Sequence, residues 1–149
     1  MSVTDPVLLA EALSRLPHGP EFRFLDRLLE LEPGKRGVGA YTLRGDEPFL
    51  RGHFPGDPLL PGVLLIEAAA QLAGVVAQSD PGIPPLRGLK LTALRGVKIL
   101  GSARPGETLR VEAEVTGRMG NLVQAAARVE LHGGGWIATA ELILSGTAG

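Results

Sequence analysis

The stretch GHFPGDPLLPGVLLIEAAAQ, residues 52–71, joins a loop rich in proline and glycine to an apolar run that carries one carboxylate, Glu67. The run predicts a helix from about Pro61 to Gln78, and the turn residues SDPG end it. Alanine, valine, leucine and isoleucine occupy most of its positions, which indicates a helix buried on most sides. An acid within such a helix needs a physical reason.

Glu67, Gln71, Gly74 and Gln78 are spaced by offsets of four, seven and eleven residues, so they form one stripe along the helix. The simplest interpretation is a solvated face, because surface helices usually show one polar stripe. Against it, the stripe is narrow, carries no lysine or arginine, and follows directly on a loop that contains His53. A functional site on this stripe is therefore the competing hypothesis.

The segments before the helix predict one short helix and two strands. Residues 5–16 have a cap, a first-turn proline and apolar residues at helical spacing. Residues 21–31 and 37–44 have strand character and are separated by the turn EPGK, and residues 46–60 form a proline-rich loop.

The segments after the helix alternate with the period of strands. In ETLRVEAEVTG, Leu109, Val111 and Ala113 face one side while charged residues face the other. NLVQAAARVEL and GWIATAELILSG continue the pattern, and residues 88–100 form an earlier strand. Long antiparallel strands around one apolar helix predict an α+β fold, in which residues 1–149 form a single domain with the sheet wrapped around the helix.

Composition excludes several classes of function. With 149 residues, 44% of them hydrophobic and a net charge of -1, the chain is a globular protein, and 4% aromatic residues leave few stacking platforms for nucleic acid. The absence of cysteine excludes disulfides and thiolate metal sites, and no metal or cofactor is expected. Glu67 and Gln71 interrupt the longest apolar run, which argues against a membrane span. No leader-like pattern opens the chain, so the cytoplasm is expected.

Three histidines are present, and most lone histidines are structural. His18 and His132 have no obvious acid partner, so we interpret both as structural. His53 differs because prolines and glycines surround it, and such a loop holds a side chain in place.

GHFPGDPLLPGVLLIEAAAQ closely resembles the signature of the bacterial 3-hydroxyacyl-(acyl carrier protein) dehydratases of fatty-acid biosynthesis. The resemblance extends through LPHGPEFRFLDRLLELEPGKR and weakens after about residue 85. Glu67 favours the type with broad chain-length range, because the isomerising decanoyl type carries an aspartate there.

The resemblance implies a hot-dog fold and a lyase that works as a homodimer, or a trimer of such dimers, without a cofactor. His53 of one subunit would meet Glu67 of the other. The expected substrate is an acyl thioester on acyl carrier protein or CoA. The backbone N–H of Gly62 would bind the thioester oxygen, and further substrate contacts are expected from Phe54, Pro61, Val63 and Gln71.

The chemistry can also be argued without the resemblance. Loss of water from a 3-hydroxyacyl thioester requires a base for the C2 proton and an acid for the leaving hydroxyl. Histidine ordinarily titrates near neutral pH and suits the first role, which we assign to His53. Burial favours the protonated form of a carboxylic acid, which suits Glu67 for the second role, and Gln71, one turn further on, would orient its carboxyl group.

Residues 86–110 hold six lysines or arginines and one acid, Glu107. Such a cluster is usually a solvated face, but here it is a candidate for docking an acidic carrier. The docking candidates are Lys90, Arg95, Lys98 and Arg104. The family pattern is broken nearby, because Ile99 stands for an aromatic residue, and Leu100 and Gly101 stand for basic ones.

Two alternatives remain. A thioesterase on the same fold would use the carboxylate with water, although the HFPG loop argues against it. A non-catalytic protein that binds acyl thioesters is the other, because fold does not determine function.

Overall fold

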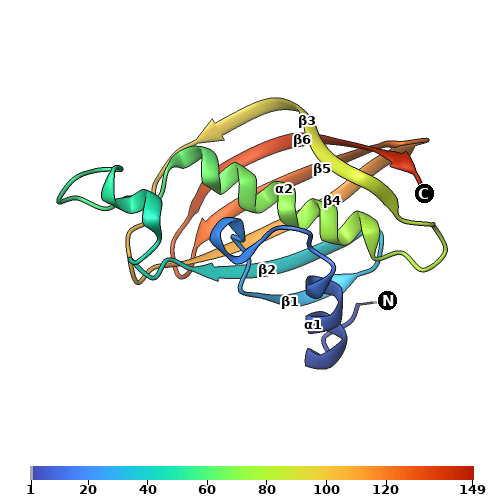
Figure 1. Cartoon of the computed structure of the whole chain (residues 1–149), viewed down its shortest axis with the longest axis horizontal. Coiled ribbons are helices and arrows are strands. Elements are labelled where there is room, and N and C mark those ends of the chain that lie inside the picture. Colours follow the sequence, from blue (N-terminus) through green and yellow to red (C-terminus); the bar gives the residue numbers. More distant parts are fainter. Residues whose placement is uncertain (1) are drawn as a thin grey trace.

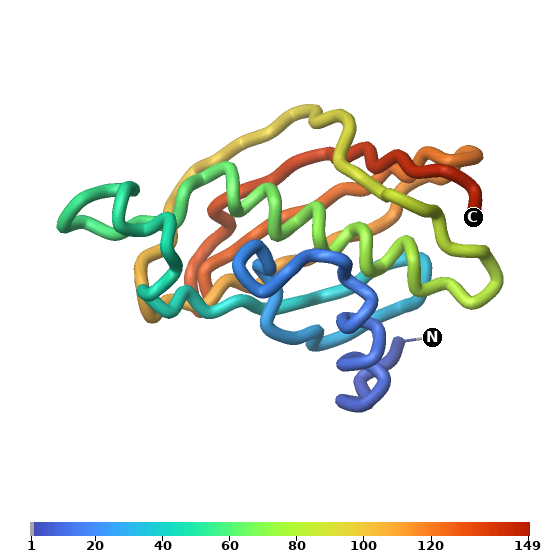
Figure 2. The backbone as a smooth tube through the Cα atoms, viewed as in Figure 1, coloured from blue at the N-terminus to red at the C-terminus, as the bar shows by residue number. Residues whose placement is uncertain are grey.

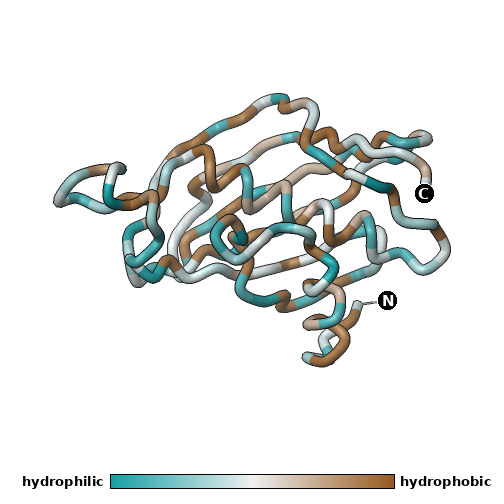
Figure 3. Tube along the Cα trace, in the orientation of Figure 1, coloured by the Kyte–Doolittle hydropathy of each residue, from teal (hydrophilic) through white to brown (hydrophobic). Residues whose placement is uncertain are grey.

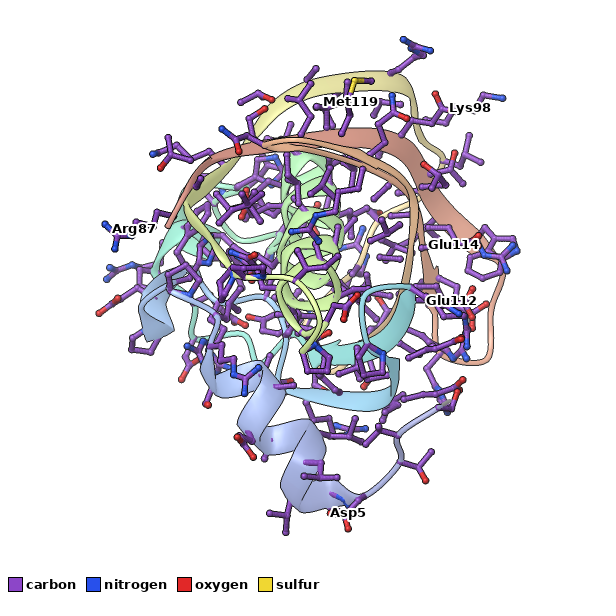
Figure 4. The ribbon with its side chains drawn as sticks, turned by 90° about the vertical axis from the view of Figure 1, so that its right-hand side faces the viewer. Asp5, Arg87, Lys98, Glu112, Glu114 and Met119 are labelled. Carbon is purple, nitrogen blue, oxygen red and sulfur yellow. The ribbon has the colours of Figure 1, made fainter. Side chains whose placement is uncertain are left out.

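The computed structural model describes residues 2–149 and confirms the α+β architecture. The long helix α2 (Gly62–Gln78) lies across the concave face of a six-stranded antiparallel sheet (Figure 1). Seen along the helix, the sheet curves around it (Figure 4). A helix wrapped by one sheet is the hot-dog arrangement, as expected from the sequence.

The sheet order is β1-β2-β4-β5-β6-β3. The strands β4, β5 and β6 follow one another as hairpins, whereas β3, which comes directly after α2, pairs with β6 at the far edge. The strand bounds are β1 (Arg27–Glu32), β2 (Arg36–Thr42), β3 (Leu86–Ile99), β4 (Thr108–Met119), β5 (Leu122–Leu131) and β6 (Trp136–Ala148). The two edge strands are therefore β1, from the N-terminal part of the chain, and β3, which directly follows α2.

Alternation in the sequence becomes the two faces of the sheet. Leu109, Val111 and Ala113 of β4 are buried toward α2, as predicted, and β5 alternates between buried and exposed residues along most of its length. The hydropathy colouring shows the apolar length of α2 in the middle of this arrangement (Figure 3). Leu72 and Val76 of α2 have no exposed surface, so the core lies between the helix and the sheet.

Close packing of the helix on the sheet requires a glycine at one crossing. A Cβ atom at Gly37 of β2 would lie 2.8 Å from Val76 Cγ2. Any larger residue would force α2 away from the sheet, because core side chains leave no spare volume.

The short N-terminal helix α1 (Pro6–Ser14) is confirmed. The Asp5 side chain caps it by accepting hydrogen bonds from the N–H groups of Val7 and Leu8, at 2.8 and 3.3 Å. Leu9 and Leu13 bury its inner face. Within residues 2–149, no helix has both the length and the apolar character needed to cross a membrane.

The strand predicted over residues 21–31 is wrong in its first part. Pro20–Phe22 form a 3-10 turn, and β1 begins only at Arg27. The physical reason is a tertiary contact, because the N–H of Phe24 donates to the Gln71 side chain of α2 at 2.9 Å instead of joining the sheet. Residues 46–60 form the predicted loop, which also contains a 3-10 turn at Pro48–Arg51.

A buried carboxylate holds the corner where β2 leads into that loop. Glu47 is 5% exposed and accepts hydrogen bonds from the Tyr41 hydroxyl at 2.5 Å and from the N–H groups of Arg44 and Gly45 at 3.1 and 2.7 Å. Burial raises the pKa of Glu47, but these hydrogen bonds outweigh burial and hold the pKa below its ordinary value. Glu47 is therefore charged in the folded protein and fixes the start of the loop.

We predict that Glu47→Gln lowers the free energy of unfolding by about 2 kcal/mol at neutral pH, because an amide cannot accept all three hydrogen bonds. The folded-state pKa lies below the unfolded one, so the contribution of Glu47 is fully present above the unfolded value of about 4.3 and is lost as pH falls through the folded value. Denaturant unfolding at several pH values should show the difference between parent and variant shrinking in acid. Asp46→Asn, at a neighbouring exposed acid, is the control, and a pH-independent difference for Glu47→Gln would contradict the prediction.

Candidate active site on helix α2

The polar stripe of α2 lines a cavity of about 830 Å³. Glu67, Gln71, Gly74 and Gln78 all contribute to its wall. The segment before β1 and the strand β3 cover this face of the helix (Figure 1). The interpretation of the stripe as a plain solvated face is therefore wrong, and the volume is typical of a small-molecule site.

The rest of the cavity wall is mostly apolar. The side chains that contribute include Leu16, Phe22, Ala70, Val75, Leu89 and Leu91. At Gly74 a Cβ atom would meet only Leu89 Cδ2, at 3.9 Å, so the missing side chain leaves open space along the helix. Gln78 lies near the other end of the stripe and is locked there by two hydrogen bonds with the backbone of Leu86, at 2.7 and 3.0 Å.

Gln71 is 2% exposed. It ties residues 15–26, the covering segment that lies between α1 and β1, to the helix. Its Oε1 accepts from the N–H of Phe24 at 2.9 Å, and its Nε2 donates to the carbonyl of Phe22 at 2.8 Å. The same Nε2 donates to Glu67 Oε2 at 3.1 Å. The contact from Gln71 to the carboxyl group, predicted from their spacing, is present.

Glu67 is less buried than predicted. Its side chain is 23% exposed in the single chain, although the residues on both sides, Ile66 and Ala68, are buried. The cause is the cavity itself, because the carboxyl group points into open space rather than into packed side chains.

The prediction that His18 has no acid partner is wrong. His18 Nε2 lies 3.5 Å from Glu67 Oε2, and the residue lines the cavity. The two residues are 49 positions apart, and the contact arises because Gln71 and Arg23 hold the covering segment in place. Sequence spacing contains no signal for such a contact. His132 lies exposed after β5, where the chain turns toward β6.

His53 lies in the loop before α2, which projects beyond the end of the sheet (Figure 2). Its Nδ1 is 2.8 Å from the carbonyl oxygen of Leu59, and its ring stacks on Phe54 with centroids 4.0 Å apart. A carbonyl can only accept, so Nδ1 carries the hydrogen and the neutral ring keeps its lone pair on Nε2. The peptide bond between His53 and Phe54 is cis.

The loop is braced by its own turn and by an ion pair. Phe54 and Asp57 exchange backbone hydrogen bonds of 2.9 and 2.8 Å, and Arg104 contacts the Asp57 carboxylate at 2.7 Å. His53 is thereby fixed in orientation, as expected for a catalytic side chain, but it is not among the residues that line the cavity around Glu67. A single chain does not bring the two predicted catalytic groups together in this cavity.

The remaining predicted substrate contacts lie where α2 begins. Gly62 is the first helical residue, so its N–H has no partner within the helix. A Cβ atom at Gly62 would lie 3.0 Å from Ile99 Cγ2. Ile99, which stands where the family has an aromatic residue, therefore packs against the start of α2. Phe54 and Val63 are 49% and 69% exposed, and Pro61 directly precedes the helix.

The six cations of residues 86–110 do not form one patch. Arg110 lies on β4, three strands from β3, and contacts Glu112 at 2.5 Å. Arg104 is paired with Asp57 near the His53 loop. Lys98 and Arg87 on β3 are exposed, and both point outward in Figure 4.

The cluster is therefore smaller than the sequence suggested. Lys90, Arg95 and Lys98 are spread along β3, and Arg95 is 4.0 Å from Glu141 of the neighbouring strand β6. Lys90 also lines the cavity, so one of these cations lies close to the site itself.

The geometry can now be compared with known proteins. The family model for the FabA-like domain matches residues 16–141, which include the covering segment, the His53 loop and α2. The chain belongs to the FabA-like domain family. Three curated relatives of this FabA-like protein are named 3-hydroxyacyl-(acyl-carrier-protein) dehydratase FabZ, which confirms the resemblance to the 3-hydroxyacyl-(acyl carrier protein) dehydratases.

The relative from Chloroflexus aggregans is 39% identical, with 72% of this chain and 74% of the relative covered. The relative from Acetivibrio thermocellus is 43% identical, with coverages of 66% and 67%. The relative from Clostridioides difficile is 42% identical, with coverages of 76% and 79%.

Solved structures confirm the fold. The dehydratase heterocomplex ApeI:P from Xenorhabdus doucetiae matches with a TM-score of 0.75 and 19% identity over 90% of each chain. Zebra fish thioesterase superfamily member 2 matches with a TM-score of 0.66 and 14% identity over 91% of each chain. Because enzymes with different names share this fold, activity has to be argued from the site.

Proposed function

We propose that this FabA-like protein is a hydro-lyase that removes water from 3-hydroxyacyl-(acyl carrier protein) thioesters in fatty-acid biosynthesis and forms trans-2-enoyl thioesters. The observation that carries the proposal is the carboxyl group of Glu67, held by Gln71 inside an otherwise largely apolar cavity. Relatives named as this dehydratase, at about 40% identity over most of the chain, support the same activity. The cytoplasmic location expected from the sequence stays a prediction.

The reaction needs two proton transfers on neighbouring carbons. Nε2 of His53, whose lone pair is left free by the Nδ1 contact with Leu59, takes the C2 proton. The C3–O bond breaks, and the hydroxyl leaves as water with the proton of the Glu67 carboxyl group. The electron pair of the broken C2–H bond becomes the new C2–C3 double bond, so charge and atoms balance.

The thioester oxygen gains negative charge while the C2 proton leaves. The N–H of Gly62 at the start of α2 is the donor proposed for it, and the helix dipole adds a favourable potential at that end. Phe54 lies in the loop before α2, and Pro61 and Val63 flank Gly62 in the sequence. We propose that these three residues contact the thioester arm.

The acyl chain is proposed to follow the stripe past Gly74 toward Gln78. Apolar side chains such as Val75 and Leu89 line the cavity beside this path.

A complete site is proposed to form between two subunits. His53 lies outside the lining of the cavity that holds Glu67 within one chain, so His53 of the partner subunit would complete the pair. A homodimer, or a trimer of such dimers, provides the required second copy. The exposed apolar residues of the edge strand β3, Leu94 and Val97, support an interface there.

We predict that His53→Ala and Glu67→Gln each lower kcat by about 10²- to 10⁴-fold, because each removes one proton transfer. Production of the enoyl thioester is the readout, and circular dichroism checks the fold. His132→Ala and Glu114→Gln, at exposed positions, are the matched controls and should keep parental rates. Rates within about threefold of the parent for either catalytic variant would refute its assignment.

Mixing the two inactive variants tests the shared site. In a hybrid dimer one site loses both catalytic groups and the other keeps both, so random subunit exchange should restore about one quarter of parental activity. Mass spectrometry of intact dimers would verify the exchange. Hybrids that form without any recovery of activity would show that each site is built within one chain.

The substrate is proposed to arrive on an acidic carrier protein that docks on cationic side chains of β3, beside the subunit interface proposed for Leu94 and Val97. Lys90, at the cavity wall, would meet the carrier's phosphate group, and Arg95 and Lys98 would meet its acidic surface. Arg104 is a weaker candidate than the sequence suggested, because Asp57 already pairs with it. CoA thioesters remain the alternative substrate.

Replacing Lys90, Arg95 and Lys98 together with Glu should raise KM for the carrier-bound substrate far more than for a short pantetheine thioester, with kcat nearly unchanged. The effect should weaken as salt screens charges beyond about 8 to 10 Å. Lys35→Glu, in the turn between β1 and β2, is the control. Equal changes in KM for both substrates would place the three cations at the cavity entrance, and no change would make them a solvated face.

A further inference from the structure

His18 lies at the wall of the cavity, beside the carboxyl group that the proposed reaction needs. Its Nε2 is 3.5 Å from Glu67 Oε2, the same oxygen that accepts the hydrogen bond from Gln71 Nε2 at 3.1 Å. Two side chains from different parts of the fold therefore converge on one carboxyl oxygen. The structure of residues 2–149 shows no such hydrogen bond or ion pair to the other oxygen, Oε1, of this cavity-lining residue.

The orientation of the Gln71 amide follows from its backbone partners. The N–H of Phe24 can only donate and the carbonyl of Phe22 can only accept, so the atom near Glu67 must be the amide nitrogen. Glu67 Oε2 is thus an acceptor. In a protonated carboxyl group whose Oε2 accepts, the hydrogen sits on Oε1.

The tautomer of His18 follows from a similar argument. Its Nδ1 is buried and has no hydrogen-bond partner among residues 2–149. A hydrogen on Nδ1 would leave a buried donor unpaired and, in the neutral ring, turn the Nε2 lone pair toward a carboxyl oxygen. A neutral ring with its hydrogen on Nε2 leaves Nδ1 as an unpaired acceptor, but it removes the repulsion between the Nε2 lone pair and the carboxyl oxygen and directs a donor at Glu67.

The covering segment holds this ring in place. The Arg23 guanidinium donates to the carbonyls of Leu16 and His18 at 3.0 and 3.1 Å, so the backbone around the histidine is clamped. The ring of Phe22 stacks on His18 with an interplanar angle of 20°. The backbone that carries the imidazole is therefore held beside the carboxyl group.

We propose that His18 is a positioning residue for the proposed dehydration: its Nε2–H and the Gln71 amide both hold Glu67 Oε2, so that Oε1 is the oxygen that delivers the proton to the leaving hydroxyl. The Gln71 hydrogen bond and the 3.5 Å contact from His18 both strengthen when the acid becomes a carboxylate, because interactions of N–H donors with an ionised acceptor are stronger. They thus stabilise the state that forms as the proton leaves. The proposal rests on the assignment of Glu67 as the acid.

Kinetics of two substitutions test it. His18→Ala should lower kcat by about 10- to 100-fold, the effect expected from losing one N–H donor beside a group that becomes charged, and should change KM less than about threefold. His18→Gln, whose side-chain amide can place a donor near the Nε2 position, should recover most of the loss. His132→Ala is the matched control for removal of a histidine, and thermal unfolding checks that each variant is folded.

A double-mutant cycle separates positioning from a structural role. In the Glu67→Gln background, His18→Ala should change the residual rate less than about twofold, because no proton remains to be positioned. An equal loss in both backgrounds, an equal loss for the Ala and Gln variants, or a parental kcat for His18→Ala would overturn the proposal.

A readout that needs no turnover distinguishes this proposal from the proposed function. Imidazole ¹⁵N NMR of the parent should show the Nε2–H tautomer of His18, with resonances that shift in Glu67→Gln. An Nδ1–H tautomer, or resonances indifferent to Glu67→Gln, would overturn the proposal even if the parent is an active dehydratase. If the parent and His132→Ala form no enoyl product, the proposed function fails, and the NMR result still decides whether His18 positions Glu67.

Discussion

The buried amide of Gln71 is the interaction on which the site depends. Its three hydrogen bonds join the backbone of residues 22 and 24 to α2 and reach the carboxyl group of Glu67. Without them the backbone of residues 22 and 24 has no polar attachment to the helix, and buried backbone groups would be left unpaired. One side chain thus fixes part of the cavity wall and holds the carboxyl group of the proposed acid, so the fold and the proposed chemistry share the same three bonds.

The wrapped sheet explains why one chain would supply two separate halves of the proposed reaction centre. α2 fills the concave face, so its polar stripe can open only toward the gap between the covering segment and β3. The loop that carries His53 connects β2 to α2. Glu47 braces its start, and Arg104 braces it through Asp57. Each half is held by its own hydrogen bonds and ion pairs, which suits a site assembled from two preformed surfaces.

Much of the fold could be predicted because its determinants are local. The apolar run after Pro61 defines α2, and strict alternation defines β4 and β5. Residues 21–26 were mispredicted because the N–H of Phe24 donates to a side chain 47 positions away, which no local pattern encodes. The stripe of α2 predicted the positions of Glu67 and Gln71, but whether it faced water depended on elements packed over it.

Two further misreadings have a similar cause. The acid neighbour of His18 was missed because it is remote in sequence, and Arg110 was counted in the basic run of residues 86–110 because its neighbours in the chain are basic. The strand order places Arg110 across the sheet from β3, beside acids of its own face. Contacts between distant segments, rather than residue types, decide both cases.

The most direct test of the account is to incubate the protein with a 3-hydroxyacyl-(acyl carrier protein) thioester and to follow the mass of the carrier-bound group. We expect a product lighter by one water, still attached to the carrier and with a new C2–C3 double bond. Release of the free carrier thiol and a hydroxy acid would instead show a thioesterase. Binding without any change of mass would show an acyl-thioester-binding protein, and either result would contradict the roles assigned to Glu67 and His53.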